Sequence, residues 1–135
     1  NNTTFAFAEV KLGITPATIS PYVIKRIGEY NARELMLTGR RFKGEEAQTF
    51  GLVNKSLPEE KLEEELYNII KHLKTSAPGA MKACKELIYS VTSKLAFGDA
   101  LDYTANLIAE LRASEEGQEG LQAFLEKRKA YWMND

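Results

Sequence analysis

The chain has 135 residues, of which 44% are hydrophobic and 27% are charged, so extended disorder is not expected. Its 18 basic and 19 acidic residues nearly balance, whereas general nucleic-acid binding typically requires a basic excess. The sequence holds no run of about 18 apolar residues and opens without a signal-peptide pattern. We therefore expect neither a nucleic-acid partner nor a membrane segment.

Residues 4–12 form an alternating segment in which Phe5, Phe7 and Glu9 would share one face of an extended strand. We predict a strand through about Phe7, with Glu9 at its exit. A carboxylate at that point either turns outward into solvent or lies in an apolar pocket with a raised pKa. A single strand cannot satisfy both of its edges, so its partner is expected from sequence or a chain beyond this one.

Glycine, proline and capping residues divide the next part of the chain into short helices. The first is predicted from Ser20, whose oxygen would cap it, to about residue 27, where Gly28 ends it. Asn31 and Glu34 are spaced as a capping box for a second helix that Gly39 ends.

From residue 44 onward the pattern is helical, apart from a brief extended segment predicted at residues 52–54. Apolar side chains recur at the 3.6-residue period of amphipathic helices. Ser114 is placed to cap the last helix. Cys84 falls on an apolar helix face and is expected to be buried. The predicted helices begin near residues 44, 58, 76, 98 and 114.

Four segments resemble, in order, motifs of the crotonase superfamily, which contains the enoyl-CoA hydratases and isomerases. The first has a glutamate ahead of Leu-Gly and a proline turn, and the second reads Ala-Arg-Glu-Leu-Met-Leu-Thr-Gly. The third reads Glu-Ala-Gln-Thr-Phe-Gly-Leu-Val-Asn, and the fourth is the closing helix. Any one of them is weak by itself, but together they span essentially the whole chain. The four segments are residues 5–16, 32–39, 46–54 and 114–129.

The resemblance implies the C-terminal part of the α/β crotonase fold, mostly helical with a short N-terminal β segment and most of its sheet missing. Residues 1–57 would be the end of the crotonase core with an active-site segment. Residues 58–135 would be a C-terminal helical trimerisation region.

The same resemblance implies a lyase that adds water across a 2-enoyl-CoA double bond. Two glutamates would grip one water, and backbone amides would hold the thioester oxygen. Glu9 matches the second glutamate, usually assigned to the proton on the α-carbon. The first glutamate and the amides lie upstream in the family, so this chain alone is expected to be inactive. By pattern alone, Glu9 is more simply an exposed carboxylate at a strand end.

Three residues near the C-terminus match substrate-binding positions of the family. Lys127 matches a lysine that reaches a CoA phosphate, although a solvated cation at a helix end would look the same. Ile108 and Phe124 match positions that line the acyl pocket, and plain helix core explains them equally well.

Pro16, Ala17 and Ile19 are predicted to form a wall of the acyl pocket. Many enoyl-CoA hydratases have Gly-Gly-Thr-Gln after the proline, and this sequence has the bulkier Ala-Thr-Ile-Ser. The Pro-Ala-x-Ile-Ser run is more similar to the methylglutaconyl-CoA hydratase type of leucine breakdown.

No cofactor is expected beyond the CoA thioester substrate. No metal is expected either, because His72 and Cys84 are the only histidine and cysteine. The resemblance implies a homotrimer or dimer of trimers, in the bacterial cytoplasm or the mitochondrial matrix, acting in fatty acid or leucine metabolism. Two alternatives stay open: another crotonase reaction, such as isomerisation or decarboxylation, or a non-catalytic helical association module if the chain is complete.

Overall fold

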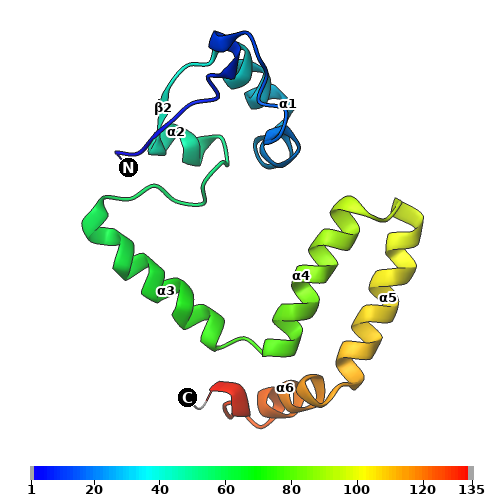
Figure 1. Cartoon of the computed structure of the whole chain (residues 1–135). Helices are drawn as coiled ribbons and strands as arrows, with labels where there is room; N and C mark the ends of the chain where they lie inside the picture. Colours follow the sequence, from blue (N-terminus) through cyan, green and yellow to red (C-terminus); the bar gives the residue numbers. More distant parts are fainter. Residues whose placement is uncertain (1, 134–135) are drawn as a thin grey trace. The chain divides into compact units, whose positions relative to one another are not determined.

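The structure is a computed structural model that describes residues 2–133 (Figure 1). It divides into two compact units, Asn1–Glu65 and Leu66–Asp135, and each is described by itself. Helices dominate both units. The predicted functional division between residues 57 and 58 stays a prediction.

Unit 1 contains a small antiparallel sheet. Strand β1 (Thr4–Phe5) pairs with β2 (Phe42–Lys43), with Thr4 opposite Lys43 and Phe5 opposite Phe42. The Lys43 ammonium also donates a 3.0 Å hydrogen bond to the Thr4 hydroxyl. The expectation that the partner of the first strand lies outside this chain is therefore wrong for one edge. The strand is also shorter than predicted, because pairing ends at Phe5.

Aromatic side chains from the sheet form the core of unit 1. Phe42 is 2% exposed, and its ring centroid lies 5.6 Å from that of Phe5, 6.0 Å from Phe7 and 5.9 Å from Phe50. Leu35 and the other buried apolar residues of α1 and α2 join this cluster. Burying such aromatic surface supplies most of the hydrophobic stabilisation available to a small unit.

Helix α1 (Ser20–Thr38) contains both helices predicted for this region. Gly28 has φ 76° and ψ 163°, so it interrupts the helix at the predicted point, and the two parts continue across the kink. Gly39 ends the helix in the left-handed conformation and donates its N–H to the Leu35 carbonyl, as predicted for a glycine cap.

The two predicted side-chain caps in α1 are wrong. The Ser20 hydroxyl donates to the Ala17 carbonyl instead of accepting from a helix amide. The Asn31 amide donates to the Ile27 carbonyl across the Gly28 kink, and residue 31 already lies inside the second part of α1, so it is not a helix start. Glu34 accepts from Arg40 at 2.8 Å instead of completing a capping box.

Helix α2 (Gly44–Thr49) follows β2 directly, and Gly51 adopts φ 79° just after it. Residues 52–54 form bends and not the predicted extended segment. Their course is set by the end of α2, because the amides of Leu52 and Val53 both donate to the Ala47 carbonyl. A short 3-10 helix, η2 (Glu59–Lys61), leads to α3 (Leu62–Lys74).

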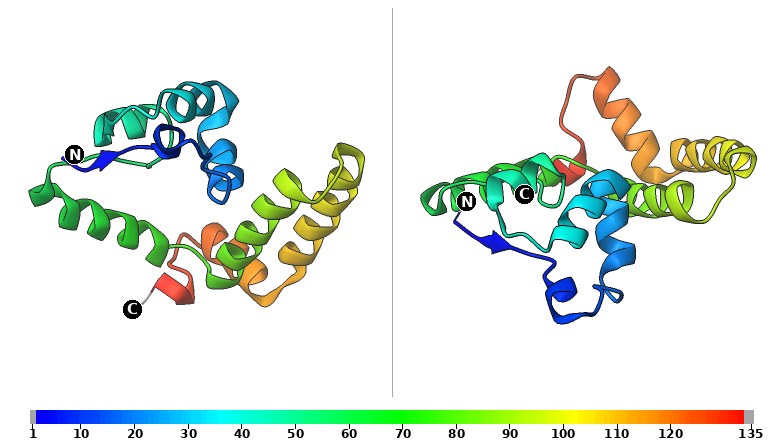
Figure 2. Two further views of the ribbon diagram at one scale, coloured as in Figure 1. Left: turned by 45° about the horizontal axis from the view of Figure 1, so that its top comes forward. Right: turned by 90° about the horizontal axis from the view of Figure 1, so that it is seen from above.

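Unit 2 is helical. It contains most of α3, then α4 (Pro78–Ser93), α5 (Phe97–Ala113), α6 (Glu115–Leu125) and the 3-10 helix η3 (Tyr131–Met133). Helices α4 and α5 form a hairpin, and α6 packs against α5 (Figures 1 and 2). The Ser114 side chain accepts a 3.1 Å hydrogen bond from the Gly117 amide, which confirms the predicted cap of the last helix.

Many apolar side chains of unit 2 are exposed within that unit. Helix α3 has no buried residue, and the buried positions on α4, α5 and α6 are Ser90, Ala100 and Ala123. The Cys84 side chain is exposed as well, so its predicted burial is wrong. The periodicity identified the helices correctly, but the apolar stripes that it marked are not covered within unit 2. In the described part of the chain, no helix is both long and apolar enough to cross a membrane.

Candidate functional site

Glu9 is the first residue of the 3-10 helix η1 (Glu9–Leu12), where an extended exit was predicted. The turn is closed by backbone hydrogen bonds from Lys11 to the Ala8 carbonyl at 2.9 Å and from Ile14 to the Glu9 carbonyl at 3.2 Å. Gly13 follows with φ 76°, a conformation that glycine adopts without steric penalty. The Glu-Val-Lys-Leu-Gly run therefore folds as one compact turn with Glu9 at its start.

The Glu9 carboxylate is half-buried, and one of its oxygens, Oε2, is shielded from solvent. Within residues 2–133 this oxygen has no hydrogen-bond partner. Shielding a carboxylate oxygen without a partner is unfavourable, and such groups are uncommon in folded proteins. From its sequence context, Glu9 either turns outward into solvent or lies in an apolar pocket. The structure keeps its Oε2 oxygen out of contact with solvent.

The end of helix α1 packs against the turn that carries Glu9. A Cβ atom added at Gly39 would lie 3.2 Å from Val10 Cγ2 and from Lys11 Cε, and 3.3 Å from the Phe7 carbonyl oxygen. Gly39 therefore allows a close approach between α1 and η1. The turn that carries Glu9 is thus closed by backbone hydrogen bonds and packs closely against the end of α1 at Gly39.

Arg40, directly after Gly39, joins α1 to α2. Its guanidinium donates 2.8 Å hydrogen bonds to Glu46 and to Glu34, and it lies 5.8 Å from the centre of the Phe50 ring. Hydrogen bonds to Glu46 and then to Glu34 raise the pKa of Arg40. These two ion pairs link the end of α1 to α2.

The turn between η1 and α1 contains the three predicted pocket residues Pro16, Ala17 and Ile19. The Ala17 amide donates to the Thr15 carbonyl at 2.7 Å, and the Ser20 amide donates to the Pro16 carbonyl at 3.0 Å. Pro16 is buried, whereas Ala17 is exposed and Ile19 is 45% exposed. Ala17 and Ile19 are thus accessible within unit 1, as a wall contacting a ligand would need.

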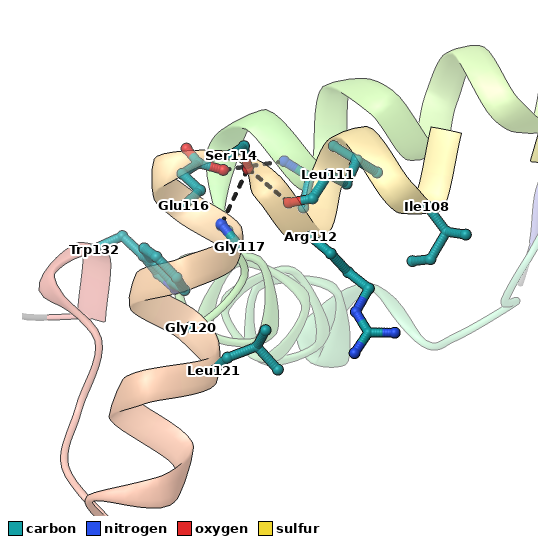
Figure 3. Close-up of a pocket in the computed structure, with 11 residues that line it drawn as sticks. Ile108, Leu111, Arg112, Ser114, Glu116, Gly117, Gly120, Leu121 and Trp132 are labelled. Carbon is teal, nitrogen blue, oxygen red and sulfur yellow. Dashed lines mark hydrogen bonds between the residues drawn. The ribbon is translucent and has the colours of Figure 1, made fainter. Parts of the chain in front are cut away.

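Unit 2 has a cavity of about 370 Å³ between α4, α5, α6 and η3 (Figure 3). Its wall is largely apolar and includes Ile108, Leu121 and Trp132, with Arg112 and Glu116 as its charged members. Trp132 also donates a 3.3 Å hydrogen bond to the Thr75 carbonyl. The sequence reasoning missed Trp132, because it lies beyond the last predicted helix and shows no periodicity.

The remaining predicted site residues of unit 2 lie apart from this cavity wall. Phe124 is 81% exposed and is not among the residues that line the cavity. Lys127 is exposed just after α6, in a left-handed backbone conformation with φ 54°. The structure thus brings Ile108, but not Phe124, to the cavity. Glu9, Pro16, Ala17 and Ile19 all belong to unit 1.

Comparison with known proteins identifies the family to which the chain belongs. The chain belongs to the enoyl-CoA hydratase/isomerase family, whose family model matches residues 1–135. The crotonase-fold prediction is confirmed at this level: a mostly helical chain with a two-stranded N-terminal sheet, consistent with a C-terminal portion of that fold.

Individual relatives support the same assignment. The chain is 35% identical over 136 aligned positions to a carnitinyl-CoA dehydratase of Salmonella typhi, covering 97% of this chain and 52% of that protein. The structure of AtuE from Pseudomonas aeruginosa matches with a TM-score of 0.91 and 39% identity, covering 98% of this chain and 52% of AtuE. An enoyl-CoA hydratase from Shewanella pealeana matches with a TM-score of 0.86 and 38% identity, covering 96% and 48%. The chain spans about half the length of the curated relatives it matches.

Proposed function

We propose that this chain carries the α-carbon acid or base of an acyl-CoA hydratase, and that Glu9 is that group. The observation that carries the proposal is the shielded Oε2 oxygen of Glu9, which has no hydrogen-bond partner in residues 2–133. It lies in a turn that backbone hydrogen bonds close and that packs against α1 at Gly39, in a chain of the enoyl-CoA hydratase/isomerase family. No protein group within residues 2–133 competes for that oxygen as a hydrogen-bond donor.

The proposed reaction adds water across the double bond of a 2-enoyl-CoA thioester. One carboxylate accepts a proton from the water molecule while the water oxygen bonds to the β-carbon, and the second carboxyl group supplies a proton to the α-carbon. Glu9 is assigned to the second step. Isomerisation and decarboxylation are the competing reactions, since they use the same thioester and differ in which acids are present.

For the acyl group we propose a branched or substituted enoyl chain, with 3-methylglutaconyl-CoA as the first candidate. The support is the Pro16-Ala17-Thr18-Ile19-Ser20 run, in which Ala17 and Ile19 add accessible side chains to the turn after Pro16. One relative is named a carnitinyl-CoA dehydratase, and a carnitinyl group is a substituted acyl group. A side-by-side assay with crotonyl-CoA and 3-methylglutaconyl-CoA separates a straight-chain from a branched preference.

We further propose that Lys127 contacts a CoA phosphate and that the working form is a homotrimer or a dimer of trimers. The exposed position of Lys127 and the uncovered apolar faces of unit 2 support these two proposals. The same apolar faces favour the second candidate function, a helical association module without catalysis. Dependence of activity on Glu9 distinguishes the two candidates.

The test is hydration of crotonyl-CoA and 3-methylglutaconyl-CoA by the Glu9→Gln variant. We assay the chain alone and the chain joined to the other half of a relative such as the Shewanella pealeana enzyme. Loss of a general acid or base should reduce the hydration rate on the order of 10²–10⁴-fold. Glu29→Gln is the matched control, because Glu29 is 78% exposed and forms an ion pair with Arg33 one helical turn away.

We expect Glu29→Gln to keep the wild-type rate and the chain alone to be inactive. A Glu9→Gln enzyme that is folded and hydrates at the wild-type rate would remove Glu9 from the reaction. Glu9-dependent turnover by the chain alone would contradict the expectation that the rest of the site lies outside it.

A further inference from the structure

The backbone at Lys127 is unusual. Among residues 2–133, Lys127 is the only residue other than glycine with a positive φ, at 54°. Its amide donates to the Phe124 carbonyl at 3.3 Å, and the amide of Arg128 donates to the Ala123 carbonyl at 3.0 Å. These two crossed hydrogen bonds form a Schellman motif at the end of α6, with Lys127 at the position that glycine usually occupies. A side chain there is unfavourable, because Cβ crowds the neighbouring carbonyl oxygen.

Arg128 fastens this turn to α6. Its terminal nitrogens donate to the two carboxylate oxygens of Glu119 at 2.6 and 2.8 Å, and its Nε donates to Glu126 at 2.6 Å. Glu119 also accepts the Tyr131 amide at 3.1 Å. Arg128 is the principal cause of the lowered pKa of Glu119. Residues on both sides of Lys127 are therefore tied to one helical turn of α6, which holds Lys127 in its unfavourable conformation.

The Lys127 ammonium itself makes no ion pair with any residue in the part of the chain that the structure describes. Lys127 thus occupies a position where glycine would be more stable, and its charge has no internal partner. Strained backbone that the surroundings hold in place is characteristic of functional positions. An outward-directed ammonium on a fixed turn suits a phosphate group.

We propose that Arg128 is a positioning residue for anion binding: its bidentate pair with Glu119 holds Lys127 in the left-handed conformation and so aims the ammonium at a ligand phosphate. This inference rests on the proposed function, in which that ligand is a CoA ester. The left-handed backbone at Lys127 lowers the stability of the fold. Replacing Lys127 by glycine should therefore stabilise the fold and weaken binding.

The test measures urea unfolding and the affinity for coenzyme A as a function of salt concentration. The whole chain is used, as wild type and as Lys127→Gly, Arg128→Gln and the double variant. Lys127→Gly should raise the unfolding midpoint, weaken coenzyme A binding by up to about fivefold and reduce its salt dependence. Arg128→Gln should weaken binding although Lys127 is retained. The double variant should bind no more weakly than Lys127→Gly, because Arg128 acts through Lys127.

Lys129→Gly is the matched control. It removes the same charge two residues away, at a position without a positive φ, and should lower the midpoint slightly while leaving affinity nearly unchanged. An unchanged or lowered midpoint for Lys127→Gly would overturn the inference, as would unchanged coenzyme A affinity or additive losses in the double variant. Absence of coenzyme A binding by the wild-type chain would overturn it as well.

Failure here is distinguishable from failure of the proposed function. Wild-type binding by Lys127→Gly, together with loss of hydration in Glu9→Gln, would remove only the role of Lys127 and Arg128. Binding that depends on Lys127 in a protein whose hydration does not depend on Glu9 would remove only the proposed reaction.

Discussion

At the scale of single residues, Gly39 sets how closely the end of α1 approaches the turn that carries Glu9. Its φ of 55° favours glycine, and a Cβ atom there would lie 3.2 Å from Val10 and Lys11 side-chain atoms. Both effects oppose a side chain at this position. Gly39 therefore helps to determine how closely η1, which carries Glu9, packs against the end of α1.

Gly39→Ala should lower the free energy of unfolding by about 1–2 kcal/mol, the usual cost of a side chain in left-handed backbone. Urea unfolding followed by circular dichroism measures this change. The matched control is Gly98→Ala, because a Cβ at Gly98 meets no atom within 4 Å and Gly98 lies in the first turn of α5 without a positive φ. Equal midpoints for the two variants would contradict the proposed close packing of α1 on η1.

The sequence led to Glu9 only through the motif around it. Alternation alone favoured an exposed strand-end carboxylate, because period-two patterns carry no information on tertiary shielding. The Glu119–Arg128 pair and Trp132 were not predicted at all. The pair spans nine residues, more than the three or four that a helical period relates, and Trp132 lies beyond the last periodic segment.

At the scale of elements, an acidic side chain of α6 caps α4. The Glu116 carboxylate accepts hydrogen bonds from the amides of Gly79 at 3.0 Å and Ala80 at 3.2 Å. The residue before α4, Ala77, provides no side-chain cap of its own. Glu116 therefore satisfies free amides at the positive end of the α4 dipole and joins the two helices.

Glu116→Ala should destabilise unit 2 by about 1 kcal/mol, the typical value for loss of a helix cap. Thermal or urea unfolding is the measurement, with Glu115→Ala as control, since Glu115 occupies the same first turn of α6. The control should cost clearly less. Equal losses would show that the contact with α4 contributes nothing beyond the charge near the α6 dipole.

The helices themselves were predictable because their signals are local. The 3.6-residue stripes and the punctuation by Gly39, Gly51 and Ser114 located α1 to α6 closely. The errors concern contacts that the periodicity does not contain. Strand β2 is too short to show a period, and its pairing with β1 is a tertiary contact. Asn31 and Glu34 bond to other nearby groups, the Ile27 carbonyl and the Arg40 guanidinium, so no capping box forms.

At the scale of the whole molecule, the uncovered apolar faces of unit 2 point to association. Leu66 and Ile69 lie three residues apart on α3 and are 57% and 47% exposed. Exposed apolar surface of this kind is typical of protein–protein contact. The proposed trimer would bury such surface.

We expect the chain to self-associate in sedimentation velocity experiments. The double variant Leu66→Glu and Ile69→Glu should shift it towards monomer, because charges on that face oppose burial. Asn68→Glu adds a charge to the same helix at an exposed polar position and should leave association unchanged. A wild-type chain that stays monomeric at every concentration would contradict the proposed assembly.

The most direct test of the catalytic role of Glu9 follows one hydrogen atom. 3-Hydroxybutyryl-CoA labelled with deuterium at the α-carbon is incubated with the form of the enzyme that hydrates crotonyl-CoA, and loss of label to water is measured. If Glu9 handles the α-proton, Glu9→Gln should slow label loss on the order of 10²–10⁴-fold, whereas Glu29→Gln should not. Label loss at the wild-type rate in a folded Glu9→Gln enzyme would contradict the assignment.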